Sequence, residues 1–265
     1  MTATPIPRTL ALTLYGDLDL TVLDELPPGR REILTRHVPA AGKRDTLSFI
    51  RQKLREGRQA YFVFPLVDES DKLALQSAIK AHGELEGVFK DFRVALLHGR
   101  MKQEEKDAVM EEFRANRVHV LVSTLVIEVG IDVPNASIMV IDHCERYGLS
   151  QLHQLRGRIG RGSFESSCIL FGKKSERIGV FVGTQDGFRI AEADLRLRGP
   201  GELLGTRQSG LPELKAARLL EDAKLLEQAR EDAFALVARD PFLKDAPALR
   251  ELLARGRSAS LLHVG

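Results

Sequence analysis

The residues best suited to chemistry lie in one arginine- and glycine-rich stretch, QLRGRIGRG, at positions 154–162. Arginine stays ionised and donates paired hydrogen bonds, which suits a phosphoryl group whose charge grows during transfer. The preceding SQLHQ is typical of a helix, so Arg158 and Arg161, three positions apart, are expected on one helical face within reach of one anion. The intervening glycines let another surface come close. We interpret the two arginines as a nucleotide-sensing pair; the alternative is a cationic helix end that stabilises its own dipole.

A second candidate stretch is VSTLVIEVGIDVP, at positions 122–134, which follows a predicted buried strand. Its Thr124 hydroxyl and the backbone amides near Gly130 can bind a phosphate. The Asp132 carboxylate can accept a hydrogen bond from a ribose hydroxyl. The alternative is a threonine in a turn and an aspartate that caps a helix. The stretch becomes informative because it precedes the arginine segment at a short, fixed distance.

An acidic pair, Asp24 and Glu25, follows a predicted strand and could be mistaken for the magnesium-binding pair of a nucleotide hydrolase. Such a pair needs a phosphate loop, and the pattern GxxxxGK[ST] does not occur in the sequence. We therefore assign no metal-binding residues.

Composition favours a globular protein with a core and a smaller second unit, because 43% of the 265 residues are hydrophobic and 29% are charged. Residues 151–210 carry ten Lys or Arg against six Asp or Glu, which predicts a local anion-binding surface.

Cys144 and Cys168 lack metal-ligand spacing and are expected to be reduced thiols. Without a long apolar run or a signal peptide, we expect a cytoplasmic protein that has no membrane partner.

Helix-like and strand-like segments alternate from residue 32 to residue 172, which predicts an α/β fold built on a parallel sheet with right-handed crossovers. The expected strands are ILTRHV, AYFVFPLV, RVALLHG, VHVLVST, SIMVIDH and SSCILF. We expect a helix over residues 72–90 with a break near Gly83. Loops at the carboxyl ends of parallel strands form the binding crevice of such folds. These loops carry Pro65, His98, Gly99, Thr124, Gly130, Asp132 and His143.

The pattern changes after residue 173. Two short helices separated by Gly183 and ended by Gly199 predict a helical hairpin. A glycine-rich loop follows, then a long amphipathic helix over 213–239 and a final helix near 246–255. Residues 1–26 are expected to form a short apolar helix and a strand, and residues 27–31 a stiff linker.

Several of these stretches together resemble a known family. MTATPIPR, YFVFP, LLHGRM, VSTLVIEVGIDVP and QLHQLRGRIGRG occur in the order of superfamily 2 helicase motifs III to VI. The segment DGFRIAEADLRLRGPGELLGTRQSG is similar to the translocation motif of the RecG family of branched-DNA helicases, with the Mfd translocases as the nearest cousins. The resemblance covers nearly the whole chain and implies a RecA-like helicase lobe.

The resemblance also implies roles for individual residues. At the nucleotide, it implies that Arg158 and Arg161 are arginine fingers, which reach the γ-phosphate. It also implies that Gln154, Gly130 and Asp132 belong to the nucleotide site. At the DNA and the translocation hairpin it places Thr124, Arg177, Arg198, Arg207 and Gln208. Thr2 and Thr4 would couple hydrolysis to lobe movement. The implied cofactors are ATP and Mg²⁺, bound mainly by a first RecA-like lobe, and the implied partner is branched or duplex DNA.

The family's phosphate loop, acidic pair and amino-terminal wedge have no counterpart in this sequence. We therefore expect residues 1–26 to be the remnant of a first RecA-like lobe, 32–172 the second lobe, and 173–265 the translocation hairpin with a helical region. The chain alone is expected neither to hydrolyse ATP nor to bind it tightly. One alternative is a stand-alone, non-catalytic DNA-binding or docking module. A second is an RNA-directed helicase lobe, although the TRQSG sequence argues against it.

Overall fold

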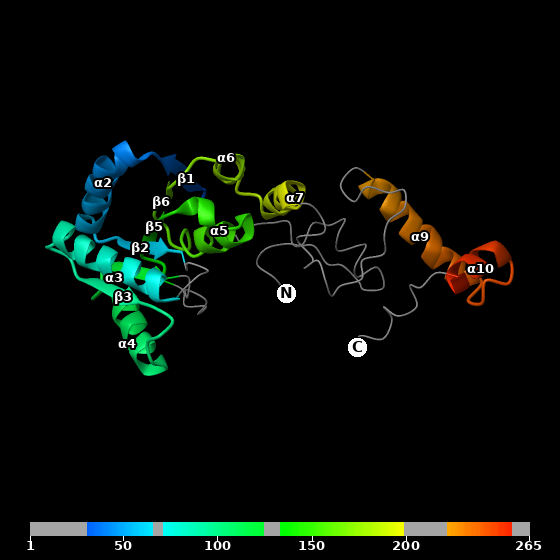
Figure 1. The fold of residues 1–265 in the computed structure, drawn as a ribbon, viewed down its shortest axis with the longest axis horizontal. Helices are drawn as coiled ribbons and strands as arrows, with labels where there is room; N and C mark the ends of the chain where they lie inside the picture. Colours follow the sequence, from blue (N-terminus) through cyan, green and yellow to red (C-terminus); the bar gives the residue numbers. More distant parts are fainter. Residues whose placement is uncertain (1–30, 66–70, 125–132, 199–221, 256–265) are drawn as a thin grey trace. The chain divides into compact units, whose positions relative to one another are not determined.

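The computed structural model describes residues 31–65, 71–124, 133–198 and 222–255 (Figure 1). These residues fall into two compact units, one that continues to residue 190 and one that holds 191–198 and 222–255. The predicted elements of residues 1–26, the linker as far as residue 30, and the glycine-rich loop lie outside the described residues.

The first unit is built on a six-stranded parallel sheet in the order β1-β6-β5-β2-β4-β3. Its strands are β1 (Ile33–Val38), β2 (Gln59–Phe64), β3 (Val94–Leu97), β4 (Val120–Thr124), β5 (Ala136–Ile141) and β6 (Ser166–Phe171). All six coincide with predicted strands. Every residue of β2, β4, β5 and β6 is buried, as expected for parallel strands covered on both faces.

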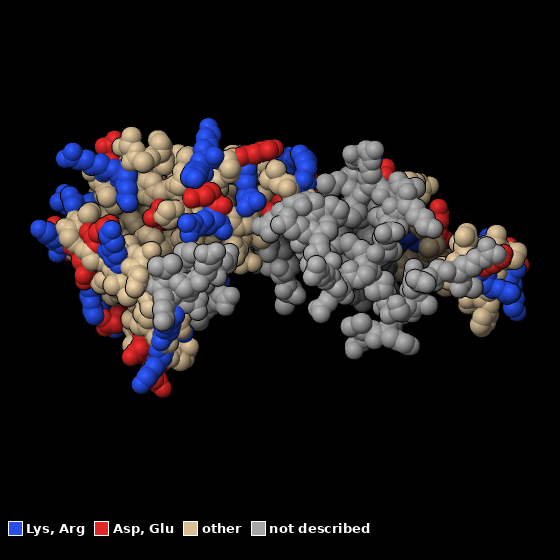
Figure 2. All heavy atoms as spheres, in the orientation of Figure 1, with Lys and Arg blue, Asp and Glu red and all other residues tan. Residues whose placement is uncertain are grey.

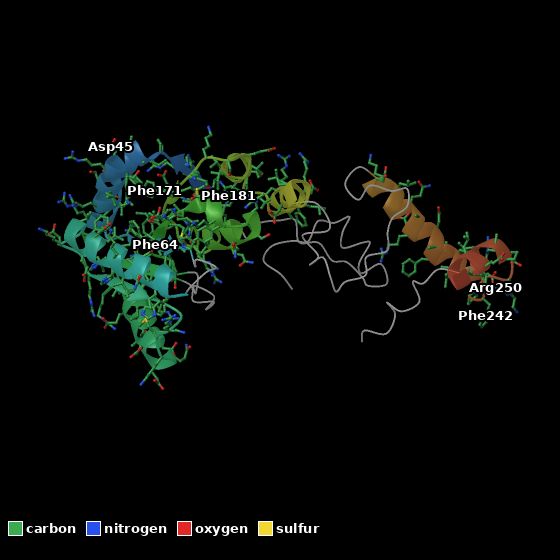
Figure 3. All side chains as sticks on the ribbon, viewed as in Figure 1. Asp45, Phe64, Phe171, Phe181, Phe242 and Arg250 are labelled. Carbon is green, nitrogen blue, oxygen red and sulfur yellow. The ribbon has the colours of Figure 1, made fainter. Side chains whose placement is uncertain are left out.

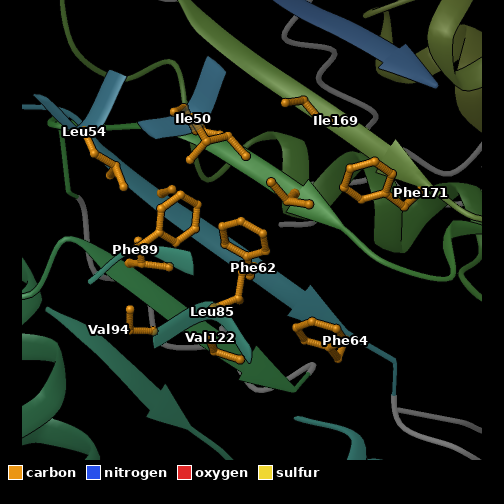
Figure 4. Packing of buried hydrophobic residues seen from close by; sticks show 14 residues of the cluster. Ile50, Leu54, Phe62, Phe64, Leu85, Phe89, Val94, Val122, Ile169 and Phe171 are labelled. Atoms are coloured by element: carbon orange, nitrogen blue, oxygen red, sulfur yellow. The ribbon is translucent and has the colours of Figure 1, made fainter. Parts of the chain in front are cut away.

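Helices cover both faces of the sheet, as predicted. On one face α2 (Lys43–Arg55) and α3 (Asp71–Val88) contribute Ile50, Leu54 and Leu85 to a core with alternate strand residues such as Phe62, and Phe89, directly after α3, joins it (Figure 4). On the other face α4 (Gln103–Arg114) packs Phe113 against Tyr61, with ring centroids 4.9 Å apart. The right-handed crossover from β5 to β6 carries α5 (Leu149–Arg156) on this second face.

The predicted break near Gly83 is wrong, because α3 runs through this residue without interruption. Gly83 is exposed, and a Cβ added there would meet no other atom within 4 Å. The glycine therefore lies on the solvent side, where it costs only about 1 kcal/mol relative to alanine. By contrast, Gly57 follows α2 with a φ of 81° and ends that helix as predicted.

The two short helices predicted after residue 173 are present as α6 (Glu176–Gly183) and α7 (Gly187–Arg198). The Ser175 hydroxyl caps α6 by accepting a hydrogen bond from the N–H of Ile178 at 3.4 Å. In the second unit, α9 (Ala223–Arg239) is the described part of the predicted long helix, and α10 (Pro247–Arg255) is the predicted final helix. None of the described helices is long and apolar enough to cross a bilayer.

Candidate nucleotide-sensing segment

The arginine segment departs from the helical face expected for it. Helix α5 ends at Arg156, and Arg158 and Arg161 lie in the turn and loop that follow, residues 157–162, which we call the arginine turn. The N–H of Gly157 still bonds to the carbonyl of His153, whereas the N–H of Arg158 bonds to Leu155, only three residues back. The expectation that Arg158 and Arg161 project from one helical face is therefore wrong, because this glycine-rich sequence leaves the helix before either arginine.

The glycines do allow the close approaches that the sequence predicts. Gly160 has a φ of 77°, and a Cβ added there would lie 2.9 Å from Cγ1 of Ile33. A Cβ at Gly162 would lie 2.4 Å from the carbonyl oxygen of Pro134. The arginine turn is thus held against β1 and against the residues that precede β5.

The two predicted finger residues differ in their surroundings. Arg161 is exposed, and its Nε donates to the carbonyl of Gly157 at 3.3 Å. Arg158 is partly buried, and its guanidinium makes no hydrogen bond or ion pair with another described residue. Gln154 is exposed on α5. The structure therefore places Gln154, Arg158 and Arg161 in one short segment. Of the two guanidinium groups, at least that of Arg158 has no hydrogen-bond or ion-pair partner among the described residues.

Sequence reasoning missed the function of the third arginine, Arg156, which is only 2% exposed. Its Nη1 donates to the carbonyl oxygens of Phe181 at 3.0 Å and Thr184 at 2.9 Å, and to the Thr35 hydroxyl at 3.3 Å. Its guanidinium carbon lies 4.2 Å from the centroid of the Phe181 ring, which is labelled in Figure 3. Arg156 therefore joins the end of α5 to α6 and to β1.

Two further contacts link the start of α5 to the region of α6. Arg177 on α6 donates to the carbonyl of Tyr147 at 3.4 Å, so the residue predicted to link the hairpin does contact the segment before α5. The Glu145 carboxylate accepts the N–H of Lys173 at 2.9 Å. Burial disfavours the charged form of Glu145, but hydrogen bonds from the N–H groups of Glu145 and Lys173 outweigh it and lower its pKa.

Thr124 lies apart from the arginine turn, at the carboxyl end of β4. It is 2% exposed, and its hydroxyl has no hydrogen-bond partner among the residues that the structure describes. His98 directly follows the neighbouring strand β3, and burial is the main cause of its lowered pKa. Thr124 and the arginines are thus carried by two different regions of the same unit.

Several predicted site residues cannot be placed. Gly130, Asp132, Thr2, Thr4, Arg207 and Gln208 lie outside the described residues. Arg198 is the last residue of α7, and its side chain lies outside what the structure describes. Among the described residues, no group of three or more His, Cys, Asp or Glu side chains could hold a metal ion. Figure 2 shows Lys and Arg beside Asp and Glu over the unit that holds the sheet, so charge on this face is mixed.

Comparison with known proteins identifies the class of this lobe. The model of the helicase conserved C-terminal domain matches residues 43–163. The model described as ATP-dependent DNA helicase RecG, domain 3, C-terminal, matches residues 184–255. The six-stranded sheet and these matches define the carboxyl-terminal RecA-like lobe of a superfamily 2 helicase.

Individual relatives narrow the class to one family. The chain is 53% identical over 256 residues to the ATP-dependent DNA helicase RecG of Synechocystis and 50% identical over 251 residues to that of Bacillus subtilis. These alignments cover 94% and 92% of the chain but 31% and 37% of the relatives. A structure of RecG bound to a three-way DNA junction aligns with a TM-score of 0.67 and 50% identity, over 85% of this chain and 30% of that one. The chain is homologous to the C-terminal region of RecG helicases and spans about a third of the length of these relatives.

Proposed function

We propose that the chain forms the C-terminal part of an ATP-dependent DNA helicase that translocates on branched DNA, in the cytoplasm. The similarity to RecG proteins supports the activity, and the solved RecG complex with a three-way junction supports the class of DNA. Because the chain spans about a third of these relatives, the proposed activity needs a first RecA-like lobe and a wedge domain in addition. The proposed contacts with DNA are mainly to phosphates and therefore sensitive to salt.

Arg158 and Arg161 are the proposed fingers. Their turn projects two guanidinium groups within four residues, and Arg158 is not neutralised by any described side chain. Guanidinium donors stabilise the charge that develops on phosphoryl oxygens during transfer. Bound ATP would supply the phosphoanhydride bond whose hydrolysis drives the movement. The ligands of Mg²⁺ are proposed to come mainly from the first lobe, as the resemblance to superfamily 2 helicases implies.

The observation that carries the proposal is the buried link from the arginine turn to the hairpin. Arg156 precedes Arg158 by two residues and donates to two carbonyls at the end of α6. Arg177 returns from α6 to the backbone before α5. A shift of the finger segment on nucleotide binding would therefore displace α6 with it, and the proposed output is movement of the hairpin along duplex DNA.

A chimaeric helicase tests the proposal. The C-terminal region of Bacillus subtilis RecG is replaced by this chain, and ATP hydrolysis is measured with and without a three-way junction. The chimaera should hydrolyse ATP in response to the junction, and Arg161→Ala should lower that rate by about 10³-fold. Arg114→Ala, which removes an exposed arginine of α4, is the matched control and should leave the rate within about twofold. A folded, junction-binding chimaera whose rate is insensitive to Arg161→Ala would exclude the finger role.

A further inference from the structure

A pocket lies at the carboxyl ends of β2 and β5, away from the arginine turn. These two strands are neighbours in the sheet, but the chain continues from β2 into α3 on one face and from β5 towards α5 on the other. Adjacent strands whose connections leave towards opposite faces create a crevice, and parallel α/β sheets bind their ligands there. The topology alone therefore marks this edge of the sheet as a ligand position.

The pocket has a volume of about 530 Å³, within the range of small-molecule sites. Its floor consists of apolar side chains from three strands and two helices: Leu47, Phe62, Phe64, Leu85, Val140 and Phe171. Figure 4 shows Phe64 and Phe171 near the arrowheads of β2 and β6, on the face that carries the core. Such a floor suits a flat, apolar ring more than a hydrated ion.

The rim supplies positive charge from two separate elements. Lys43 begins α2, and its Nζ lies 5.9 Å from the centroid of the Phe171 ring. Arg146 belongs to the short 3-10 helix η2 (Cys144–Arg146) after β5, and its guanidinium makes no hydrogen bond or ion pair with another described residue. Both side chains line the pocket.

The remaining charged groups of the rim are engaged with their own neighbours. Lys80 and Glu84 face each other along α3 at 3.9 Å. The Asp142 carboxylate accepts the N–H of His143 at 3.0 Å, and His143 lies 3.5 Å from Glu145. Lys43 and Arg146 therefore give the mouth of the pocket two cations that no described carboxylate pairs with, above an apolar floor.

We propose that this pocket binds a nucleoside phosphate, with the base against the apolar floor and the phosphate between Lys43 and Arg146. The ring explains the aromatic floor, and the phosphate explains the two cations on its rim. A free nucleotide and the terminal nucleotide of a DNA strand share this chemistry. The site is distinct from the arginine turn and does not depend on the finger role of Arg158 and Arg161.

Titration of the 265-residue chain tests the site. All measurements use the Arg158→Ala/Arg161→Ala background, so that binding at the arginine turn does not contribute. 2′-Deoxyadenosine 5′-monophosphate is titrated by calorimetry to about 5 mM, where millimolar affinity is still measurable. The Lys43→Ala/Arg146→Ala change should weaken binding at least tenfold, and Ala81→Phe, which fills the pocket from α3, should abolish it.

Matched variants and ligands make the result decisive. Arg44→Ala/Lys90→Ala removes the same charge from exposed residues outside the pocket and should change affinity less than twofold. Deoxyribose 5-phosphate should bind at least tenfold more weakly than the nucleotide. Equal loss in both double variants, equal binding of the sugar phosphate, or no binding at 5 mM would overturn the proposal. A short single strand with a 5′-phosphate that binds more tightly than the free nucleotide identifies a strand end as the source; equal or weaker binding identifies free nucleotide.

Discussion

Arg156 lies over the ring of Phe181 and donates a hydrogen bond to the carbonyl oxygen of the same residue, at 3.0 Å. A buried guanidinium with several acceptors contributes strongly to stability, because its removal leaves those acceptors unpaired in the interior. Arg156→Ala should therefore lower the free energy of unfolding by about 2–4 kcal/mol. Urea unfolding followed by circular dichroism measures this change.

Arg158→Ala is the control for that experiment. It removes the same functional group two residues later, from a side chain without described hydrogen bonds, so stability should change by less than about 0.5 kcal/mol. If both variants lose the same stability, Arg156 is not the residue that joins α5 to α6.

The sheet could be predicted from the sequence because its signals are local. Continuous apolar runs such as AYFVF at 60–64 are short, bounded and separated by helical patterns, and this one lies within β2. The uninterrupted α3 could not be predicted, since the cost of Gly83 depends on which side of the helix it occupies. Local propensity indicates an element more reliably than it indicates an interruption.

The candidate site was predicted in its composition but not in its geometry. Arg158 and Arg161 do lie in one segment, yet the sequence could not show that α5 stops at Arg156. Nor could it show which of the three arginines is buried, because the acceptors of Arg156 lie 25 and 28 residues later in the chain. Only the packing of α6 beside α5 brings these residues together.

Gly172→Ala should destabilise the first unit. A Cβ at this position would lie 2.1 Å from Oε2 of Glu145 and 2.9 Å from the backbone nitrogen of Cys144, and the φ of 135° is unfavourable for any other residue. We expect a loss of about 2–3 kcal/mol in the free energy of unfolding. Gly179→Ala, in α6 with nothing within 4 Å of its Cβ, should instead be neutral or stabilise by up to about 1 kcal/mol. Equal effects in thermal unfolding would contradict the contact with Glu145.

Glu145 should make stability depend on pH. Its pKa is lowered from the usual 4.5, so the folded state favours the charged carboxylate that accepts the N–H of Lys173. This contribution is present above about pH 4.5 and is lost as the pH falls through the lowered, folded-state pKa. Wild type should therefore exceed Glu145→Gln in unfolding free energy at pH 7, and the difference should shrink towards pH 3. A difference that stays constant across this range would exclude a role for the charge.

Gln185 closes the amino-terminal end of the edge strand β1. Its side-chain oxygen accepts the N–H of Ile33 at 3.1 Å, and its side-chain nitrogen donates to the Ile33 carbonyl at 3.0 Å, as a neighbouring strand would. Gln185→Ala should therefore expose this N–H and speed its hydrogen exchange at least tenfold, because an unpaired edge opens locally. Gln52→Ala, which removes an exposed amide from α2, should leave the exchange of Ile33 unchanged. If exchange at Ile33 is equally slow in both variants, β1 is held by its pairing with β6 alone, and the turn between α6 and α7 is not fastened to the sheet through Gln185.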